Sequence, residues 1–218
     1  MCPVLSTDGI LGGLWADREG YVDTTGTVLA YAGAAKKNGA TVIEHNRVLE
    51  LNQTAEGWDV VTEKGTISCE HVVNAAGLWG REVAAMAGLT LPLQPTEHQY
   101  FVTEAIPEVE ALGQRLPSIA DRDGEYYFRQ EGNGLLIGAY EEKMKFWAEE
   151  GTPLDFGHEL FDDDLDRIME NVMRAIDRVP AAAEAGVKRV INGPMIWSPD
   201  SNCLLYTSDA ADEGLGVD

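Results

Sequence analysis

The sequence predicts an α/β fold of the α+β kind, built in two layers. Helix and strand patterns alternate over residues 1–90, with a small antiparallel meander at about 46–70. Short strands separated by tight turns predominate over residues 91–192, where an acidic amphipathic helix joins them. We therefore expect an α/β layer with a meander and then a mostly antiparallel sheet with helices. Residues 193–202 are expected to return toward the first layer.

Composition limits the classes of protein to consider. The chain has 218 residues, 44% of them hydrophobic, which is enough for a sizeable core. It carries 37 acidic and 16 basic residues, a net charge of −21 that opposes binding to nucleic acid or anionic membranes. No apolar run approaches the roughly 20 residues needed to span a bilayer. We expect no membrane insertion and no nucleic-acid partner.

The three cysteines, Cys2, Cys69 and Cys203, form neither a disulfide framework nor a spaced metal site. Such cysteine usage is typical of a reducing compartment. No targeting signal is visible at the start of the chain. We therefore expect a cytoplasmic protein, or a mitochondrial matrix protein if the source is eukaryotic.

The first layer begins with a helix. Asp23 to Gly26 offer side-chain oxygens for a cap, apolar residues then recur at helical spacing, and the pattern ends at Lys36 to Gly39. A strand is expected at Ala40–Glu44. The strands of the meander are expected at Val48–Asn52, Trp58–Glu63 and Thr66–Cys69.

The stretch from His71 to Trp79 is the most informative of the chain. Its valines are typical of a strand buried on both faces, which would deliver the small residues Ala75, Ala76 and Gly77 to a helix that ends at Gly88. Two interpretations remain open from this pattern. The small residues allow either tight packing between strand and helix or close approach of a ligand to the backbone.

The second layer is predicted from alternation and turns. Its strands are expected at Leu93–Val102, Ser118–Asp121, Glu125–Gln130, Leu135–Ala139 and Val187–Asn192. An acidic helix is expected from Asp162 to about Val179, capped by its aspartates, with Leu165, Ile168, Met169, Val172 and Ile176 on its apolar face. Pro180 ends that helix, and Gly193–Pro194 is expected to turn the chain.

Residues 203–218 are expected to be non-native. Cys203 to Glu213 match an in-frame translation of a transposase-type sequencing adapter at every position, and the last five residues would then be index bases followed by more adapter. We therefore leave this tail out of fold reasoning. On this interpretation Asn202 is not the natural C-terminus, and Met1 is as readily an internal methionine as a start.

Five motifs occur in a recognisable order. They are Gly12–Trp15 with Gly20–Asp23, His71–Trp79, Gln94–Tyr100, Tyr126–Arg129 and Asn192–Pro194. With these motifs, residues 3–202 resemble the FAD-dependent amine oxidoreductases of the D-amino-acid-oxidase fold, in the dimethylglycine and sarcosine dehydrogenase branch. The resemblance implies that residues 1–90 are part of an FAD-binding layer and residues 91–192 a substrate-binding layer.

The resemblance also implies cofactor-binding residues. Ala75, Ala76 and Gly77, with Trp79 at the end of the same motif, would lie against FAD, and the main chain of Val48 would meet its adenine. Without the resemblance, Val48 is typical of a plain strand residue. The Gly-x-Gly-x-x-Gly fingerprint that seats the pyrophosphate is absent from this sequence.

His98 and Tyr126 match positions that line the substrate side of the flavin, so the resemblance implies a catalytic role for both. A histidine titrates near neutral pH, and a tyrosine hydroxyl can orient a polar substrate. Taken alone, a histidine in an alternating strand is more often a surface or core residue. The other histidines, His45, His71 and His158, have no metal-ligand spacing, and no metal is expected.

The implied chemistry is oxidation of the N-methyl group of a small amino acid such as dimethylglycine or sarcosine, with hydride passing to flavin. The resulting iminium is hydrolysed or captured by a folate. Any tetrahydrofolate site would belong to a downstream domain, and the electron acceptor is undetermined. The alternative is a noncatalytic acidic binding or folate-transfer module that keeps the fold as a scaffold.

Overall fold

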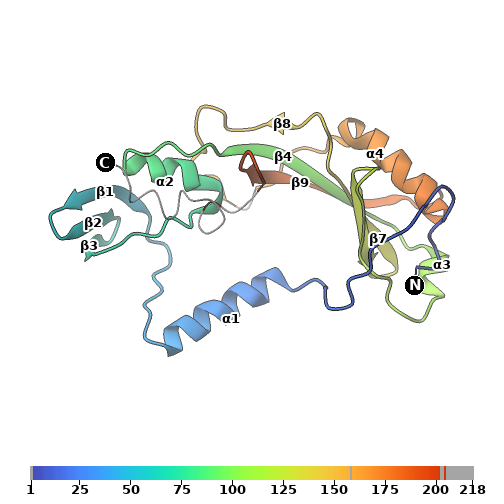
Figure 1. The fold of residues 1–218 in the computed structure, drawn as a ribbon, viewed down its shortest axis with the longest axis horizontal. Helices are drawn as coiled ribbons and strands as arrows, with labels where there is room; N and C mark the ends of the chain where they lie inside the picture. The colour runs from blue at the N-terminus through green and yellow to red at the C-terminus, as the bar shows by residue number, and fades with distance from the viewer. Residues whose placement is uncertain (1, 158, 202–203, 205–218) are drawn as a thin grey trace. The chain divides into compact units, whose positions relative to one another are not determined.

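The computed structural model describes residues 2–157, 159–201 and 204. The chain divides into two compact units (Figure 1). Unit 1 comprises Met1–Gly12, Ala75–Glu82 and Leu91–Asp218, and unit 2 comprises Gly13–Asn74 and Val83–Thr90.

Unit 2 begins with α1 (Thr24–Lys37), which confirms the first predicted helix. The predicted cap is wrong in detail, because the Asp23 side chain makes no capping hydrogen bond. Instead, the Asp23 carbonyl accepts bonds from the amide of Thr27 at 2.9 Å and from its hydroxyl at 2.7 Å. Among the described residues of α1 none is buried, so the helix buries little apolar surface within this unit.

The meander is confirmed as β1 (Val48–Thr54), β2 (Gly57–Thr62) and β3 (Gly65–Cys69), paired antiparallel in that order. Gly57 has φ +144°, and a Cβ there would lie 2.2 Å from the carbonyl oxygen of Cys69. Only glycine therefore allows β2 to begin so close to the end of β3.

The predictions of a strand before the meander and of another after it are wrong. Ala40–Glu44 and His71–Asn74 have no regular secondary structure, and Val73 is 67% exposed. A strand requires a partner for its backbone hydrogen bonds, and no described segment pairs with either stretch. Their β-branched residues favour extended backbone, but that preference alone does not make a strand.

The helix after the small residues is confirmed. The chain passes through the 3₁₀ turn η1 (Gly77–Trp79) into α2 (Gly80–Met86). It leaves the helix near Gly88, where φ is +77°. A left-handed glycine at this position is the usual way for a helix to end.

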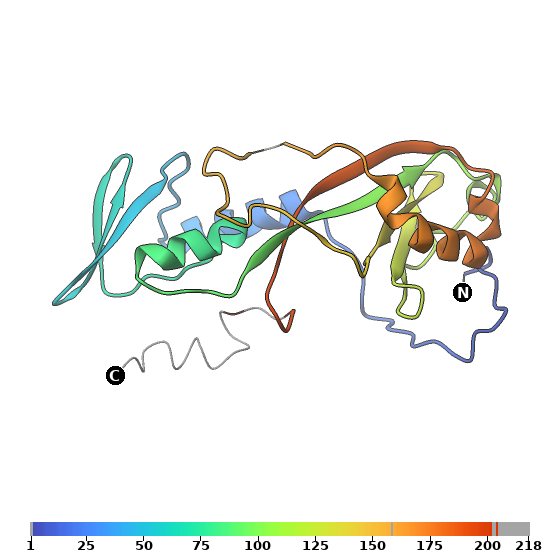
Figure 2. The ribbon, with the colours of Figure 1, turned by 90° about the horizontal axis from the view of Figure 1, so that it is seen from above.

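Unit 1 is built around an antiparallel sheet, shown from two directions in Figures 1 and 2. Its strands are β4 (Gln94–Thr103), β5 (Ile119–Asp121), β6 (Tyr126–Glu131), β7 (Gly134–Ala139), β8 (Lys145–Phe146) and β9 (Val187–Trp197). The order is β5-β6-β7-β4-β8, and β9 also pairs with β4. The predicted second sheet is thereby confirmed.

The turn predicted at Gly193–Pro194 is wrong, because both residues lie inside β9, opposite His98 and Glu97 of β4. Among the described strands, β9 pairs only with β4. Proline has no amide hydrogen to donate, and an edge strand tolerates it for that reason.

The core of unit 1 lies between the sheet and α4 (Leu165–Arg178), which packs on β6 and β7 (Figure 2). Side chains of α3 (Pro107–Glu110) and η2 (Pro180–Ala182) also pack into this core. The predicted apolar face of α4 is wrong at Met169, which is 41% exposed. Asn171 is buried instead, because its side-chain amide donates to the carbonyls of Gly124 and Glu125.

The cap predicted for α4 is also wrong, since the Asp164 side chain makes no capping hydrogen bond.

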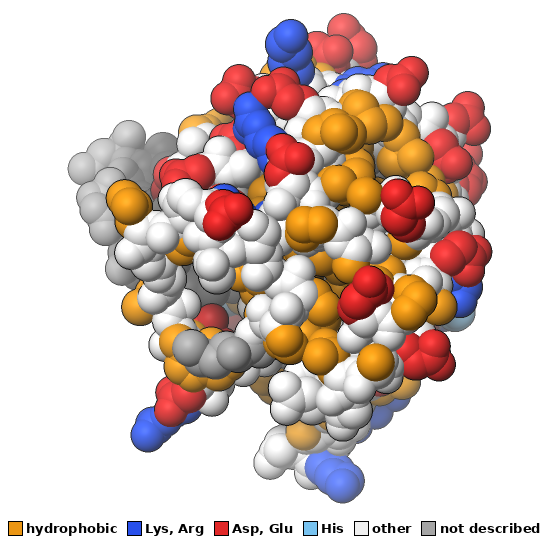
Figure 3. Space-filling model, turned by 90° about the vertical axis from the view of Figure 1, so that its right-hand side faces the viewer, with side chains coloured by type: hydrophobic (Ala, Val, Ile, Leu, Met, Phe, Trp, Pro, Cys, Tyr) orange, Lys and Arg blue, Asp and Glu red, His pale blue; other side chains and the backbone are white. Residues whose placement is uncertain are grey.

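Acidic side chains are spread over the face drawn in Figure 3, in keeping with the net charge of −21. Within the described residues, no helix is both long and apolar enough to cross a membrane.

Candidate functional site

One face of the unit 1 sheet gathers aromatic side chains from strands β4 and β6 and from the residue that follows β7. Successive residues of a strand project to opposite faces, so His98 and Tyr100 of β4 share a face while Glu97 and Gln99 take the other. Tyr100 pairs with Gly138 of β7, and Gly138 pairs with Tyr127 of β6. This register aligns Tyr100, Gly138 and Tyr127 across the sheet on the face of His98.

Three rings from this face form a cluster that we call the aromatic cluster: His98, Tyr127 and Tyr140. The ring centroids of His98 and Tyr140 are 5.6 Å apart, and those of Tyr127 and Tyr140 are 5.2 Å apart. The hydroxyl oxygen of Tyr127 lies 3.4 Å from Nε2 of His98. The rings remain partly open to solvent, with Tyr140 39% exposed.

The surroundings of the cluster favour a neutral imidazole. Burial lowers the pKa of His98, and the positive charge of the Arg167 guanidinium lowers this pKa further. Burial, assisted by the neighbouring Tyr140 and Tyr100, raises the pKa of Tyr127 to about 12. A neutral imidazole beside a protonated phenol can accept a proton from a substrate, as a general base must.

The structure does not bring Tyr126 to His98. Tyr126 projects to the opposite face of β6, where it is 1% exposed within the hydrophobic core. Its hydroxyl donates to Oδ2 of Asp121 at 2.9 Å. Burial and this carboxylate together raise the pKa of Tyr126 to about 12. The Tyr126 hydroxyl therefore already donates its hydrogen to Asp121, on the core side of the sheet.

Tyr127 and Tyr140 were not predicted from the sequence as residues of this site. The signal for Tyr127 was the period of two along β6, in which Tyr126 and Phe128 take the core face and Tyr127 takes the other. Tyr140 carried no comparable signal, because it directly follows β7 and its position depends on how that strand pairs.

The small residues predicted to meet FAD lie in unit 1 and form an open edge. Ala75 is exposed, Ala76 is half-buried, and Gly77 has φ +53°. A Cβ at Gly77 would meet no atom within 4 Å. The open backbone and small side chains fit the approach of a flat cofactor, so these residues could contact FAD.

The turn that follows these small residues is hydrogen-bonded to residues 148–153. The indole nitrogen of Trp79 donates to the carbonyl of Pro153 at 2.9 Å. The hydroxyl of Thr152 donates to the carbonyl of Leu78, and its amide donates to Oε1 of Glu82 at 2.8 Å. The position of the turn thus depends on a segment about 70 residues later in the chain.

Val48 belongs to unit 2, where it is the first residue of β1 and half-buried. Its partner across the strands is Thr62 of β2. The contact predicted between its main chain and an adenine remains a prediction. His158 lies outside the described residues, as do Cys203 and most of the tail predicted to be non-native.

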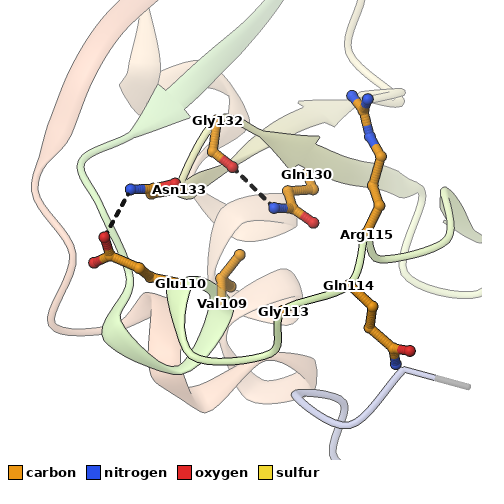
Figure 4. A pocket seen from close by; sticks show the side chains of 8 residues that line it. All are labelled: Val109, Glu110, Gly113, Gln114, Arg115, Gln130, Gly132 and Asn133. Carbon is orange, nitrogen blue, oxygen red and sulfur yellow. Dashed lines mark hydrogen bonds between the residues drawn. The ribbon is translucent and has the colours of Figure 1, made fainter.

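A shallow cavity of about 330 Å³ lies elsewhere in unit 1 (Figure 4). It is lined by Val109, Glu110, Gly113, Gln114, Arg115, Gln130, Gly132 and Asn133. Asn133 donates to Glu110 across one side, and Gln130 donates to the carbonyl of Gly132. None of the predicted site residues lines this cavity.

Known proteins resemble the chain over most of its length. The family described as FAD dependent oxidoreductase (DAO) matches residues 1–212, a range that extends into the tail predicted to be non-native. Dimethylglycine dehydrogenase, mitochondrial, of Rattus norvegicus is 45% identical over 204 residues, 91% of this chain and 24% of that protein. Sarcosine dehydrogenase, mitochondrial, of Mus musculus is 34% identical over 209 residues, 93% of this chain and 22% of that protein.

Solved structures agree with this family. L-proline dehydrogenase from P. horikoshii has a TM-score of 0.61 and 25% sequence identity, covering 81% of this chain and 44% of its own. The present chain spans about a quarter of the length of the curated relatives it matches.

Proposed function

The chain belongs to the family of FAD-dependent oxidoreductases, and we propose that it forms part of an enzyme that oxidises the N-methyl group of a small N-methylated amino acid. Dimethylglycine and sarcosine are the substrates that the names of its relatives suggest. The observation that carries the proposal is the aromatic cluster, in which a half-buried histidine faces two tyrosines on one side of the sheet.

The first task of this site is to remove a proton. An N-methylated amino acid is an ammonium ion at neutral pH, and an ammonium nitrogen has no lone pair to support loss of hydride from its methyl group. The neutral imidazole of His98 accepts the ammonium proton. FAD, when bound, supplies the hydride acceptor. The substrate becomes an iminium, which water converts to the demethylated amine and formaldehyde.

The tyrosines of the cluster have a second task. The faces of Tyr127 and Tyr140 attract a methylated ammonium through cation–π interaction, which holds the substrate before its proton is removed. The Tyr127 hydroxyl, 3.4 Å from Nε2, orients the imidazole or the substrate. We thus assign to Tyr127 the role first predicted for Tyr126, because the hydroxyl of Tyr126 is bound to Asp121 in the core.

Ala75, Ala76 and Gly77 are proposed to hold the flavin, since their open edge permits backbone contact. Capture of the one-carbon product by tetrahydrofolate would require a further domain. For location, we propose the cytoplasm or, in a eukaryotic cell, the mitochondrial matrix. The free thiols of Cys2 and Cys69 are compatible with either compartment.

The test uses the complete FAD-loaded protein under anaerobic conditions. Dimethylglycine and sarcosine are each mixed with it by stopped flow, with glycine as the unmethylated control, and bleaching of the flavin absorbance is followed. We expect a methylated substrate to reduce the flavin and glycine to leave it oxidised. In His98→Gln, reduction should slow by about 100-fold or more. Equal rates in parent and variant would contradict the proposal.

A further inference from the structure

Two members of the aromatic cluster each have a buried glutamate as a neighbour in the sequence. Glu97 precedes His98 on β4, and Glu141 follows Tyr140. Both glutamates are 7% exposed. Because Glu97 and His98 are successive residues of one strand, their side chains lie on opposite faces of the sheet. His98 therefore has a buried acid directly behind it.

A single arginine of α4 binds both glutamates. Nη1 of Arg167 forms an ion pair with Glu141, and its Nη2 lies 3.8 Å from Oε2 of Glu97, within ion-pair distance but beyond hydrogen-bond distance. The same Nη1 donates to the main-chain carbonyl of Glu97, the oxygen of the peptide bond that leads to His98. Nε of Arg167 pairs with Oδ2 of Asp164 at 3.2 Å. The Arg167 side chain is only 11% exposed.

Two further residues complete the binding of Glu97. Lys145 of β8 pairs with its Oε1 at 2.7 Å, and the side-chain amide of Asn192 of β9 donates to its Oε2 at 3.1 Å. Strands β4, β8 and β9 and helix α4 therefore meet at one carboxylate. Such a buried network is rigid when its members are paired, and it is costly to disrupt because an unpaired charge would remain inside.

We propose that Arg167 is a positioning residue of the site: by binding Glu97 and Glu141 together, it holds His98 and Tyr140 in one geometry from the opposite face of the sheet. This inference rests on the proposed function. A planar guanidinium can bind two carboxylates and a carbonyl at once, whereas a lysine ammonium on a flexible stem cannot reproduce that arrangement. Arg167 touches no substrate in this scheme and acts only through its neighbours.

The charge of Arg167 has a second consequence for His98. The groups that face or flank the imidazole are Tyr127 of β6, Tyr140 after β7, Arg167 of α4, and Glu97 with its partner Lys145 of β8. The charge of Arg167 opposes protonation of His98 and so biases the balance between imidazole and imidazolium toward the neutral form. Removal of the arginine therefore shifts this balance toward the imidazolium, which cannot accept a proton.

The experiment compares Arg167→Lys and Arg167→Gln in the complete FAD-loaded protein. Arg174→Lys and Arg174→Gln are the matched controls, because Arg174 lies on the same helix and pairs with the exposed Glu170. Flavin reduction by the methylated substrate is measured as a function of pH. The titration of His98 is followed by NMR in the 218-residue chain, which contains four histidines.

We expect Arg167→Lys to lower the limiting reduction rate by about tenfold or more, with little change in its pH midpoint, since geometry is lost and charge is kept. Arg167→Gln should lower the rate equally and also move the midpoint and the His98 titration upward by about half a pH unit or more. Variants of Arg167 that behave like the Arg174 controls would overturn the inference.

If the Arg167 variants do not fold, a third variant tests the positioning role of Arg167. Glu141→Gln keeps the side-chain size and the arginine but removes the ion pair next to Tyr140, and we expect it to slow reduction by about tenfold. A parental rate in Glu141→Gln would then refute the inference. Two results separate the claims: if no methylated substrate reduces the flavin of the parent protein, the proposed function fails, and if His98→Gln slows reduction while the Arg167 and Glu141 variants do not, the positioning role alone fails.

Discussion

Gly138 of β7 lies directly beneath the ring of Tyr127 of β6. A Cβ at residue 138 would come within 2.2 Å of the ring carbon Cζ and 2.3 Å of the hydroxyl oxygen. The glycine is therefore what allows this phenol to lie across the neighbouring strand, toward His98. A backbone position with no side chain shapes the aromatic cluster as much as the rings do.

The first prediction concerns this glycine. Gly138→Ala should displace the Tyr127 ring and slow flavin reduction by about tenfold or more, while it destabilises the fold by about 1–3 kcal/mol through overpacking. Stopped-flow reduction and thermal unfolding measure the two effects. Gly33→Ala is the control, because a Cβ at this position of α1 meets nothing within 4 Å. Reduction at the parental rate in Gly138→Ala would show that the ring position is unimportant.

The second prediction compares the adjacent tyrosines. Tyr127→Phe removes the hydroxyl that faces His98 and should slow flavin reduction by about tenfold or more. Tyr126→Phe removes the hydrogen bond to Asp121 and should cost about 1 kcal/mol of unfolding free energy with little effect on reduction. The reverse pattern would restore Tyr126 as the substrate-facing tyrosine.

A third prediction concerns pH and the turn after Gly77. Burial tends to raise the pKa of Glu82, but the bonds from the Thr152 amide and from Arg81 outweigh burial, so the pKa lies below its usual value of 4.5. A carboxyl with a lowered pKa stabilises the fold above its unfolded pKa, and this stability is lost as the pH falls through the folded pKa. Thermal unfolding between pH 7 and pH values below 4.5 should therefore be less pH-dependent in Glu82→Gln than in the parent.

The control for that measurement is Glu149→Gln, which removes an exposed carboxylate from the same neighbourhood. Its unfolding should follow the parent's pH dependence. Identical pH profiles for Glu82→Gln and Glu149→Gln would mean that the Thr152 bond does not stabilise the turn.

A fourth prediction concerns flavin in the 218-residue chain itself. The sequence lacks the Gly-x-Gly-x-x-Gly fingerprint that binds the pyrophosphate at a helix N-terminus, so the chain should purify without flavin. Its absorbance spectrum after purification and after incubation with FAD is the measurement. A stoichiometric flavin spectrum would show that the open edge at Ala75 to Gly77 suffices for binding.

Local signals predicted many elements of the fold. The helix at Thr24–Lys37, the meander and the strands around the Asn133–Gly134 turn all follow from periodicity and from turn residues close by in the chain. The wrong strands, Ala40–Glu44 and His71–Asn74, had suitable residues, but among the described residues no strand pairs with them. Strand formation depends on pairing with distant residues, which a short window of sequence does not contain.

The sequence by itself determined the family, because five motifs in order carry it, and it singled out His98 and the small residues at Ala75 to Gly77. Tertiary structure alone decided which tyrosine meets the histidine and which arginine lies behind it. Tyr126 and Tyr127 are chemically the same, and a shift of one residue in a strand exchanges the two faces of a sheet. Arg167 reaches Glu97 and Glu141 across 70 and 26 positions of sequence, a contact that only the packing of α4 on the sheet creates.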